Sequence, residues 1–171
     1  MKEIAENSDI FETPGRTRFI SEACFCYTSA MTFGSCLQKQ DEIESIFATC
    51  LTPEARYEKI IKLGQQLPPF NPAARTPANL APGCQSIMYL EVLLDHGRFI
   101  LNADSEALIS KGLAALLIKV YSGETPDTIA NCPPSFIKEI GLQTALSPAR
   151  SNGLASLYHK MRQEALKHIS S

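Results

Sequence analysis

Several features that identify a class of protein at a glance are missing from this sequence. The formal net charge is only −2, so no excess of basic residues points to a nucleic-acid-binding face. No run approaches the ~20 apolar residues that span a bilayer, and we find no internal repeat or low-complexity tract. The 171 residues, with 44% hydrophobic and 20% charged side chains, are typical of one soluble globular domain with a substantial core. Neither a nucleic acid nor a membrane is an expected partner.

The first residues also lack the pattern of an export signal. Glu3, Glu6, Asp9 and Glu12 lie where a signal peptide has positive charge followed by an apolar stretch. The same acidic residues disfavour a mitochondrial or chloroplast presequence. We therefore expect a cytoplasmic protein, whose cysteines are mostly free because the cytosol keeps thiols reduced.

The cysteines and histidines lack the spacing of a metal site. No Cys-x-x-Cys pair and no Cys/His ligand pattern occurs, so we predict neither a metal nor a cofactor of the chain's own. A Cys–His hydrolase would need His96, His159 or His168 beside a nucleophilic cysteine, together with an orienting third group, and the sequence shows no such set. The six cysteines are Cys24, Cys26, Cys36, Cys50, Cys84 and Cys132.

The chain divides into an extension and one domain. Residues 1–36 show no clear period, and we expect a disordered or loosely docked extension, with Met31 as a candidate native start. Residues 37–171 form the predicted domain. From Gln38 onward apolar residues recur at helical spacing up to Leu51. Thr52-Pro53 then predicts the cap and first residue of a second helix, which Pro68-Pro69 ends.

A β-hairpin is predicted in the middle of the chain. Residues 87–94 and 98–101 have strand character, and Asp95-His96-Gly97 between them favours a turn. Asp104 or Ser105 is the predicted cap of the next, strongly apolar helix, with Glu106 in its first turn. Short helices and a long one from Ser147-Pro148 follow. This order predicts an α+β fold in which helices back one face of a small antiparallel sheet.

Cys84 has the setting of a chemically active residue. It ends a loop rich in turn-forming residues, with Pro82 and Gly83 directly before it. Pro82 restricts the backbone, and Gly83 permits conformations closed to other residues. Loops this long in a compact domain are usually functional or disordered. The alternative, a buried structural cysteine, is the commonest fate of a free thiol. Cys132, beside two prolines, fits that alternative as a half-buried spacer.

Several motifs together resemble the SufE-like family of sulfur-acceptor proteins. The resemblance covers residues 40–167 in order, without large gaps, and departs at Ala149, where serine is usual. The extension has no counterpart. The matching motifs are Arg56-Tyr57, Ile60-Ile61, Leu63-Gly64, Leu67-Pro68, Gly83-Cys84-Gln85-Ser86, Asp104-Ser105-Glu106-Ala107, Lys111-Gly112-Leu113, Ile140-Gly141-Leu142, Leu146-Ser147-Pro148, Arg150-Ser151 and Gly153-Leu154.

The resemblance implies a fold, a function and a site. The fold is α+β and similar to that of iron–sulfur scaffold proteins. The function is to accept persulfide sulfur on Cys84 from a SufS-like cysteine desulfurase, a pyridoxal-phosphate enzyme, and so to stimulate it. Such a protein is an accessory factor rather than an enzyme, and it passes sulfur to an iron–sulfur scaffold. The residues expected to contact the partner or support the loop are Arg150, Gly83, Gln85, Ser86, Asn79 and Glu106.

Each of these residues can also have a purely structural role, and two other functions stay open. Arg150 is equally explained as a solvated arginine in a first helical turn. Glu106 with Asp104 suits a helix start better than a role beside the cysteine. Asn79 suits a loop because its side chain can bond nearby backbone. A scaffold for a nascent iron–sulfur cluster would need about three or four converging thiolates, and a carrier for another thiolation pathway would look the same in sequence.

Overall fold

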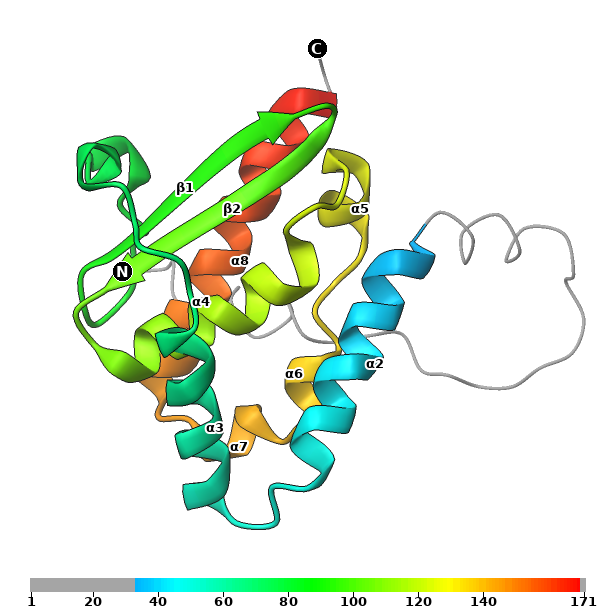
Figure 1. Cartoon of the computed structure of the whole chain (residues 1–171), viewed down its shortest axis with the longest axis vertical. Helices are drawn as coiled ribbons and strands as arrows, with labels where there is room; N and C mark the ends of the chain where they lie inside the picture. Colours follow the sequence, from blue (N-terminus) through cyan, green and yellow to red (C-terminus); the bar gives the residue numbers. More distant parts are fainter. Residues whose placement is uncertain (1–32, 170–171) are drawn as a thin grey trace, which may run out of the picture.

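The computed structural model describes residues 33–169. The fold is α+β, as predicted, with helices on either side of a hairpin in the chain order (Figure 1). The elements are α2 (Gly34–Ala48), α3 (Pro53–Gln65), two 3-10 helices (Pro72–Ala74 and Pro77–Asn79), β1 (Met88–Asp95), β2 (Arg98–Ser105), α4 (Leu108–Tyr121), α5 (Pro126–Asn131), α6 (Phe136–Glu139), α7 (Leu142–Ala145) and α8 (Pro148–Ile169).

The first described helix begins earlier than the sequence indicates. Helix α2 starts at Gly34, and the side chain of Cys36 is fully buried. Ser35 donates a hydrogen bond of 2.5 Å to Glu124, and Lys39 forms an ion pair of 2.6 Å with the same carboxylate. These contacts hold the start of α2 on the domain. The extension predicted for residues 1–36 is therefore wrong at its last residues. Its residues 1–32, with Met31, lie outside the described residues.

Helices α3 and α4 cross very closely. Thr52 caps α3 as predicted, accepting a hydrogen bond of 3.2 Å from the Ala55 amide. At the crossing, a Cβ added to Gly112 would lie 2.3 Å from the carbonyl oxygen of Ile60, and one added to Gly64 would lie 2.6 Å from the Gly112 amide nitrogen. Two glycines therefore allow the backbones to touch. This contact fixes the start of α4, which forms one wall of the site described below.

The hairpin is regular, and its second strand is longer than predicted. The antiparallel register runs from Met88↔Ser105 to Asp95↔Arg98. Strand β2 continues to Ser105, so Asp104 and Ser105 are strand residues, and the N-cap of α4 is Ala107. The expected cap at Asp104 or Ser105 is wrong because β2 pairs with β1 as far as Ser105. The Ser105 hydroxyl donates to the Ile87 carbonyl at 2.7 Å and accepts a long hydrogen bond of 3.4 Å from the Ala107 amide.

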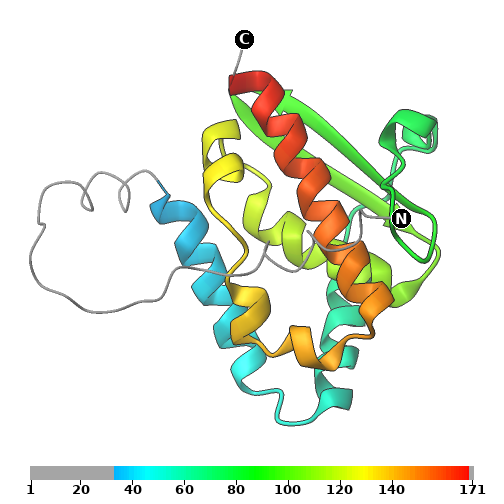
Figure 2. The same cartoon turned by 180° about the vertical axis from the view of Figure 1, so that it is seen from behind.

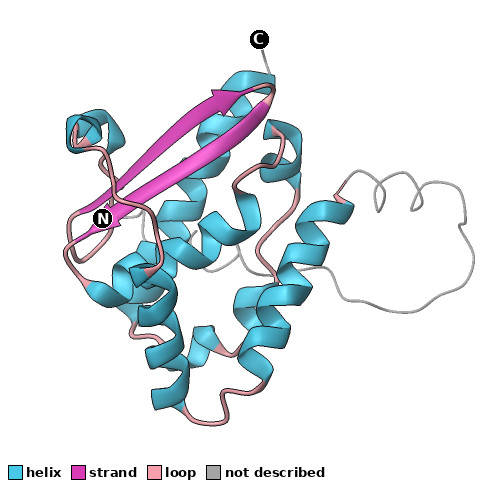
Figure 3. Ribbon diagram, viewed as in Figure 1, coloured by secondary structure: helices cyan, strands magenta, loops and turns pink. Residues whose placement is uncertain are grey.

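The core lies between one face of the hairpin and the helices. Figure 2 shows α8 in front of the hairpin, and α4 packs against β2 as well as against α3 and α8. Inward side chains of the strands, such as Leu90, Phe99 and Leu101, are almost fully buried. The loop before β1, with its two 3-10 turns, lies along the edge of the hairpin beside β1 (Figure 3). Within residues 33–169, no helix combines the length and apolarity needed to cross a membrane.

Candidate functional site

The loop that carries Cys84 is held in a defined shape. Asn79 donates a side-chain hydrogen bond of 2.8 Å to the Ala74 carbonyl, the kind of backbone bond expected of it from sequence. The Ala81 amide bonds the Met88 carbonyl at 2.8 Å, next to a β-bridge between Leu80 and Tyr89. The loop is therefore fastened to β1 shortly before its tip.

Gly83 gives the tip its turn. Its φ angle is 74°, in the left-handed region that side chains with a Cβ avoid. A Cβ added there would also lie 2.6 Å from the Ser156 hydroxyl oxygen on α8. Glycine therefore serves both the turn and the close approach to the helix. Gln85 and Ser86 continue from this turn into β1.

The thiol of Cys84 points toward α8 and is half-buried. Its Sγ lies 3.6 Å from the Gly153 carbonyl oxygen, to which the thiol can donate a weak hydrogen bond. The thiol also packs closely on this turn of α8, since a Cβ added to Gly153 would lie 3.5 Å from Sγ, in ordinary van der Waals contact. Burial raises the pKa of Cys84 above that of a free thiol. In this state the residue is a protonated, sheltered thiol.

A small cavity lies beside the thiol. Its volume is about 20 Å³, enough for roughly one water molecule. The walls come from the cysteine loop, from β1, from α4 and from the first turns of α8. Its lining residues are Cys84, Gln85, Met88, Ser110, Leu113, Ala149, Arg150, Gly153, Leu154 and Leu157. Because the cysteine loop continues directly into β1, these walls belong to three segments that are far apart in sequence.

Arg150 reaches this cavity from the first turn of α8. Its guanidinium carbon lies 5.9 Å from the centre of the Tyr57 ring, within the range of a cation–π contact. The Tyr57 hydroxyl donates a hydrogen bond of 2.7 Å to the Ala145 carbonyl, which fixes the ring. Arg150 is therefore positioned by its contact with Tyr57, with Cys84 and Gln85 lining the same cavity.

Asp104 lies at the centre of an ion-pair network near the base of the loop. It contacts Arg75 at 2.6 Å and Lys111 at 2.9 Å. Burial alone would raise the pKa of Asp104, but hydrogen bonds from Lys111 and Arg75 outweigh it and hold the pKa below its usual value. The network links the loop, β2 and α4.

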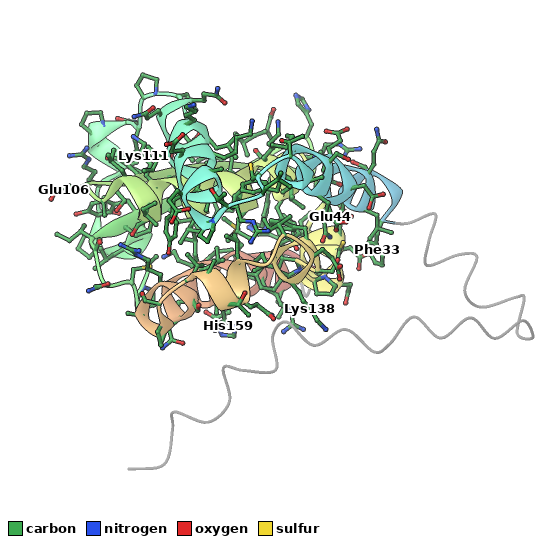
Figure 4. The ribbon with its side chains drawn as sticks, turned by 90° about the horizontal axis from the view of Figure 1, so that it is seen from below. Phe33, Glu44, Glu106, Lys111, Lys138 and His159 are labelled. Carbon is green, nitrogen blue, oxygen red and sulfur yellow. The ribbon has the colours of Figure 1, made fainter. Side chains whose placement is uncertain are left out.

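Glu106 does not line the cavity. It is exposed in the bend between β2 and α4, before the helix, so it is not the first-turn acid expected from sequence. Figure 4 shows Glu106 and Lys111 at the same end of the molecule, away from Phe33 and Glu44.

The other described cysteines are buried. Cys36 and Cys132 both accept weak hydrogen bonds from the Gln40 amide, at 3.6 and 3.3 Å. The hydrogen bond with Cys132, together with burial, raises the pKa of Cys36. Cys132 is 3% exposed, so it is a core residue rather than the half-buried spacer expected from sequence. Cys50 is buried as well. Cys24 and Cys26 lie outside the described residues.

The three histidines lie in separate settings and do not form a common site. His96 is in the hairpin turn, His159 bonds Gln163 at 2.8 Å, and His168 packs edge-on against Phe99. Between residues 33 and 169, no three His, Cys, Asp or Glu side chains gather as they would around a metal ion.

Two groups of residues at the site were missed by the sequence reasoning. One is the pairing of Arg75 and Lys111 with Asp104. The other is a row on α8, formed by Gly153, Ser156 and Lys160, that faces the cysteine loop. Their spacing of three and four residues marks one face of a helix, but sequence alone does not say which loop that face meets.

Comparison with known proteins identifies related chains. The family model for SufE, described as an Fe-S metabolism associated domain, matches residues 41–165. The SufE-like protein 1, chloroplastic/mitochondrial, of Arabidopsis thaliana is 36% identical over 129 residues. An uncharacterized SufE-like protein of Synechocystis is 37% identical over 114 residues. The alignments cover 75% and 67% of this chain, and 35% and 72% of the respective relatives, so the chain spans about a third of the Arabidopsis protein.

A solved structure supports the fold. The solution structure of a hypothetical protein from Thermus thermophilus superposes with a TM-score of 0.65 and 23% sequence identity. The match covers 78% of this chain and 97% of that protein. At this level of identity the likeness concerns the fold alone.

Proposed function

The chain belongs to the SufE family of Fe–S metabolism, and from this premise we propose that it accepts persulfide sulfur on Cys84 from a cysteine desulfurase. The partner, a pyridoxal-phosphate enzyme, is SufS-like. Removing its persulfide stimulates its turnover, and an iron–sulfur assembly scaffold receives the sulfur. The chain is then an accessory protein with no cofactor of its own. One observation carries the proposal: of the cysteines in the described part of the chain, Cys84 alone is not buried.

The transfer is a thiol exchange that needs no external oxidant or reductant. The Cys84 thiol loses its proton, and its thiolate attacks the terminal sulfur of the partner's persulfide. The partner's S–S bond breaks, and its cysteine leaves as a thiolate that takes up a proton. Cys84 now carries the persulfide. Because burial raises the pKa of Cys84, the isolated protein keeps it protonated, and docking must supply the conditions for ionisation.

The cavity beside Cys84 suits a carried sulfur atom. With about 20 Å³ it has room for one small group and little more, and several of its wall residues, such as Met88 and Leu113, are apolar. A terminal sulfur held there is less accessible to small thiols in solution, which would otherwise release it as sulfide. The half-buried setting therefore serves a carrier, while delivery requires the side chain to turn outward.

Arg150 is the best-placed residue for contact with the partner near the thiol. It lines the cavity and keeps its guanidinium over the Tyr57 ring. An arginine held in this way can pair with an acidic side chain of the desulfurase without losing much conformational freedom. Gly83, Gln85, Ser86 and Asn79 then act through the shape of the loop. Glu106 stands apart from the cavity and is a surface contact at most.

The described thiols do not support the scaffold alternative. Cys36, Cys50 and Cys132 are buried and do not share the Cys84 cavity. A cluster scaffold needs about three or four ligands in one place. The choice between iron–sulfur assembly and another thiolation pathway follows the family description. A cytoplasmic location stays a prediction from the acidic N-terminus, whereas the name of the Arabidopsis relative places that protein in organelles.

The direct test replaces Cys84 by serine. We expect the unmodified chain to raise the turnover of a SufS-like desulfurase supplied with free cysteine, measured as alanine released. The Cys84→Ser chain should give no increase. Cys50→Ala is the matched control, because it removes a thiol outside the cavity and should stimulate normally. Undiminished stimulation by Cys84→Ser would refute the assignment.

A further inference from the structure

The cysteine loop is fastened to α8 by three residues on one face of that helix. Gly153 receives the thiol of Cys84 at its carbonyl, and Ser156 lies against the backbone of Gly83. One turn further along, Lys160 reaches the loop upstream of its tip. Each of the three residues thus contacts a different part of the same loop.

Lys160 makes the strongest of these contacts. Its ammonium donates hydrogen bonds to two main-chain carbonyls of the loop, Ala78 at 2.6 Å and Leu80 at 3.1 Å. Hydrogen bonds from a charged donor are stronger than neutral ones. They hold the backbone itself, so they act on the loop whatever side chains it carries. Partial burial of the ammonium lowers the pKa of Lys160, consistent with a side chain laid along the protein surface.

On its other side the loop is held to β1 by the Ala81–Met88 hydrogen bond and the Leu80–Tyr89 bridge, but on the α8 side it has little further support at this point. An open hollow of about 360 Å³ lies between the loop residues Leu80 and Pro82 and the α8 residues Ser156, His159 and Lys160. Figure 4 shows His159 on the outer side of α8. Since the loop and helix are not packed together across this hollow, the two bonds from Lys160 bridge the gap. Leu80 is 42% exposed, so burial of its side chain contributes little to holding the loop.

We propose that Lys160 is a positioning residue that holds the Cys84 loop against α8 and thereby sets how often the thiol becomes accessible. The consequence for sulfur transfer rests on the proposed function, because the thiol must leave the Gly153 carbonyl to reach a persulfide on another protein. The effect on access is a property of the isolated chain and is tested without any partner.

The test compares rates of thiol alkylation. The full chain is treated with iodoacetamide, and modification of each cysteine peptide is followed by mass spectrometry. In Lys160→Met, which keeps an unbranched side chain up to Cε but removes the donor, we expect Cys84 to react about fivefold to tenfold faster, the scale of one lost hydrogen bond of ordinary net strength. Lys167→Met is the matched control, with the same change on the same helix about 10 Å further along. It should react at the original rate.

The sign of the change separates loop release from electrostatics. Loss of a positive charge near a thiol disfavours the thiolate, which is the reactive form, and by itself would slow alkylation. Faster reaction of Cys84 therefore reports release. Cys50 and Cys132 must keep their original rates, because equal acceleration of those buried thiols would mean general loosening of the domain and would overturn the proposal. An unchanged or slower rate at Cys84 would overturn it as well.

Sulfur transfer gives a second readout. With a SufS-like desulfurase and cysteine, Lys160→Met should reach half-maximal persulfidation at a lower desulfurase concentration, with the same plateau. Lys160→Arg, whose planar group also offers several donors, should restore slow alkylation. If Cys84 is alkylated faster in Lys160→Met but neither chain accepts sulfur, the proposed function fails while the role of Lys160 stands. If sulfur is accepted but alkylation is unchanged, only the role of Lys160 fails.

Discussion

Replacing Gly83 by alanine tests whether the shape of the cysteine loop depends on this residue. The structure predicts two separate costs. The φ angle of 74° places a Cβ in a region that costs about 1–2 kcal/mol for residues other than glycine. The added Cβ also lies 2.6 Å from the Ser156 hydroxyl oxygen, which must move. Because serine can turn to another rotamer, this second cost is about 1 kcal/mol.

The two costs can be separated by a double-mutant cycle. Gly83→Ala should lower the free energy of unfolding in urea by about 2–3 kcal/mol, the sum of both costs. Ser156→Ala alone should change it little. The double variant should recover about 1 kcal/mol, the steric part, and leave the backbone part in place. Equal stability of Gly83→Ala and the unmodified chain would refute the described loop geometry, and zero coupling would refute the contact with Ser156.

Two further predictions concern the framework around the site. Gly112→Ala should lower the free energy of unfolding by about 3 kcal/mol and the melting temperature by about 6–12 °C. The reason is that the new Cβ would meet the Ile60 carbonyl, which is part of the backbone and cannot turn away. An unchanged melting temperature would contradict the helix crossing. Asp104→Asn should destabilise the chain by about 1–2 kcal/mol at pH 7 through weakened contacts with Arg75 and Lys111. Because folding lowers the pKa of Asp104, its contribution to stability is fully present above the unfolded pKa near 3.9 and is lost as the pH falls through the folded pKa. A difference in urea unfolding between the unmodified chain and Asp104→Asn that stays constant from pH 7 to pH 3 would contradict the network.

Features set by neighbouring residues were predictable from the sequence. Thr52-Pro53 specifies a helix start because the cap and the fixed φ of proline act within one turn. Gly97 similarly indicates the hairpin turn, where its φ is 76°. The α+β class follows from the order of such elements. The Pro82-Gly83 pair drew attention to Cys84 for the same local reason.

Features set by distant residues were not predictable. Ser105 looks like a helix cap, but it pairs with Met88 of β1 and its hydroxyl bonds the Ile87 carbonyl just before that strand, so β2 runs on and Asp104 joins it. The start of α2 has weak helix formers, and it is held by Glu124, 89 residues away from Ser35. Lys160 looks like any surface lysine until its distance to the Leu80 carbonyl is known. Long-range hydrogen bonds decide each case.

The most direct test of the account is mass spectrometry of the chain after incubation with a SufS-like desulfurase and cysteine. The account predicts a mass increase of one sulfur atom on the peptide that contains Cys84, removed by a reducing thiol, with the peptides of Cys36, Cys50 and Cys132 unchanged. A sulfur atom found on another cysteine, or on none while turnover of the desulfurase rises, would contradict the claim that Cys84 is the acceptor.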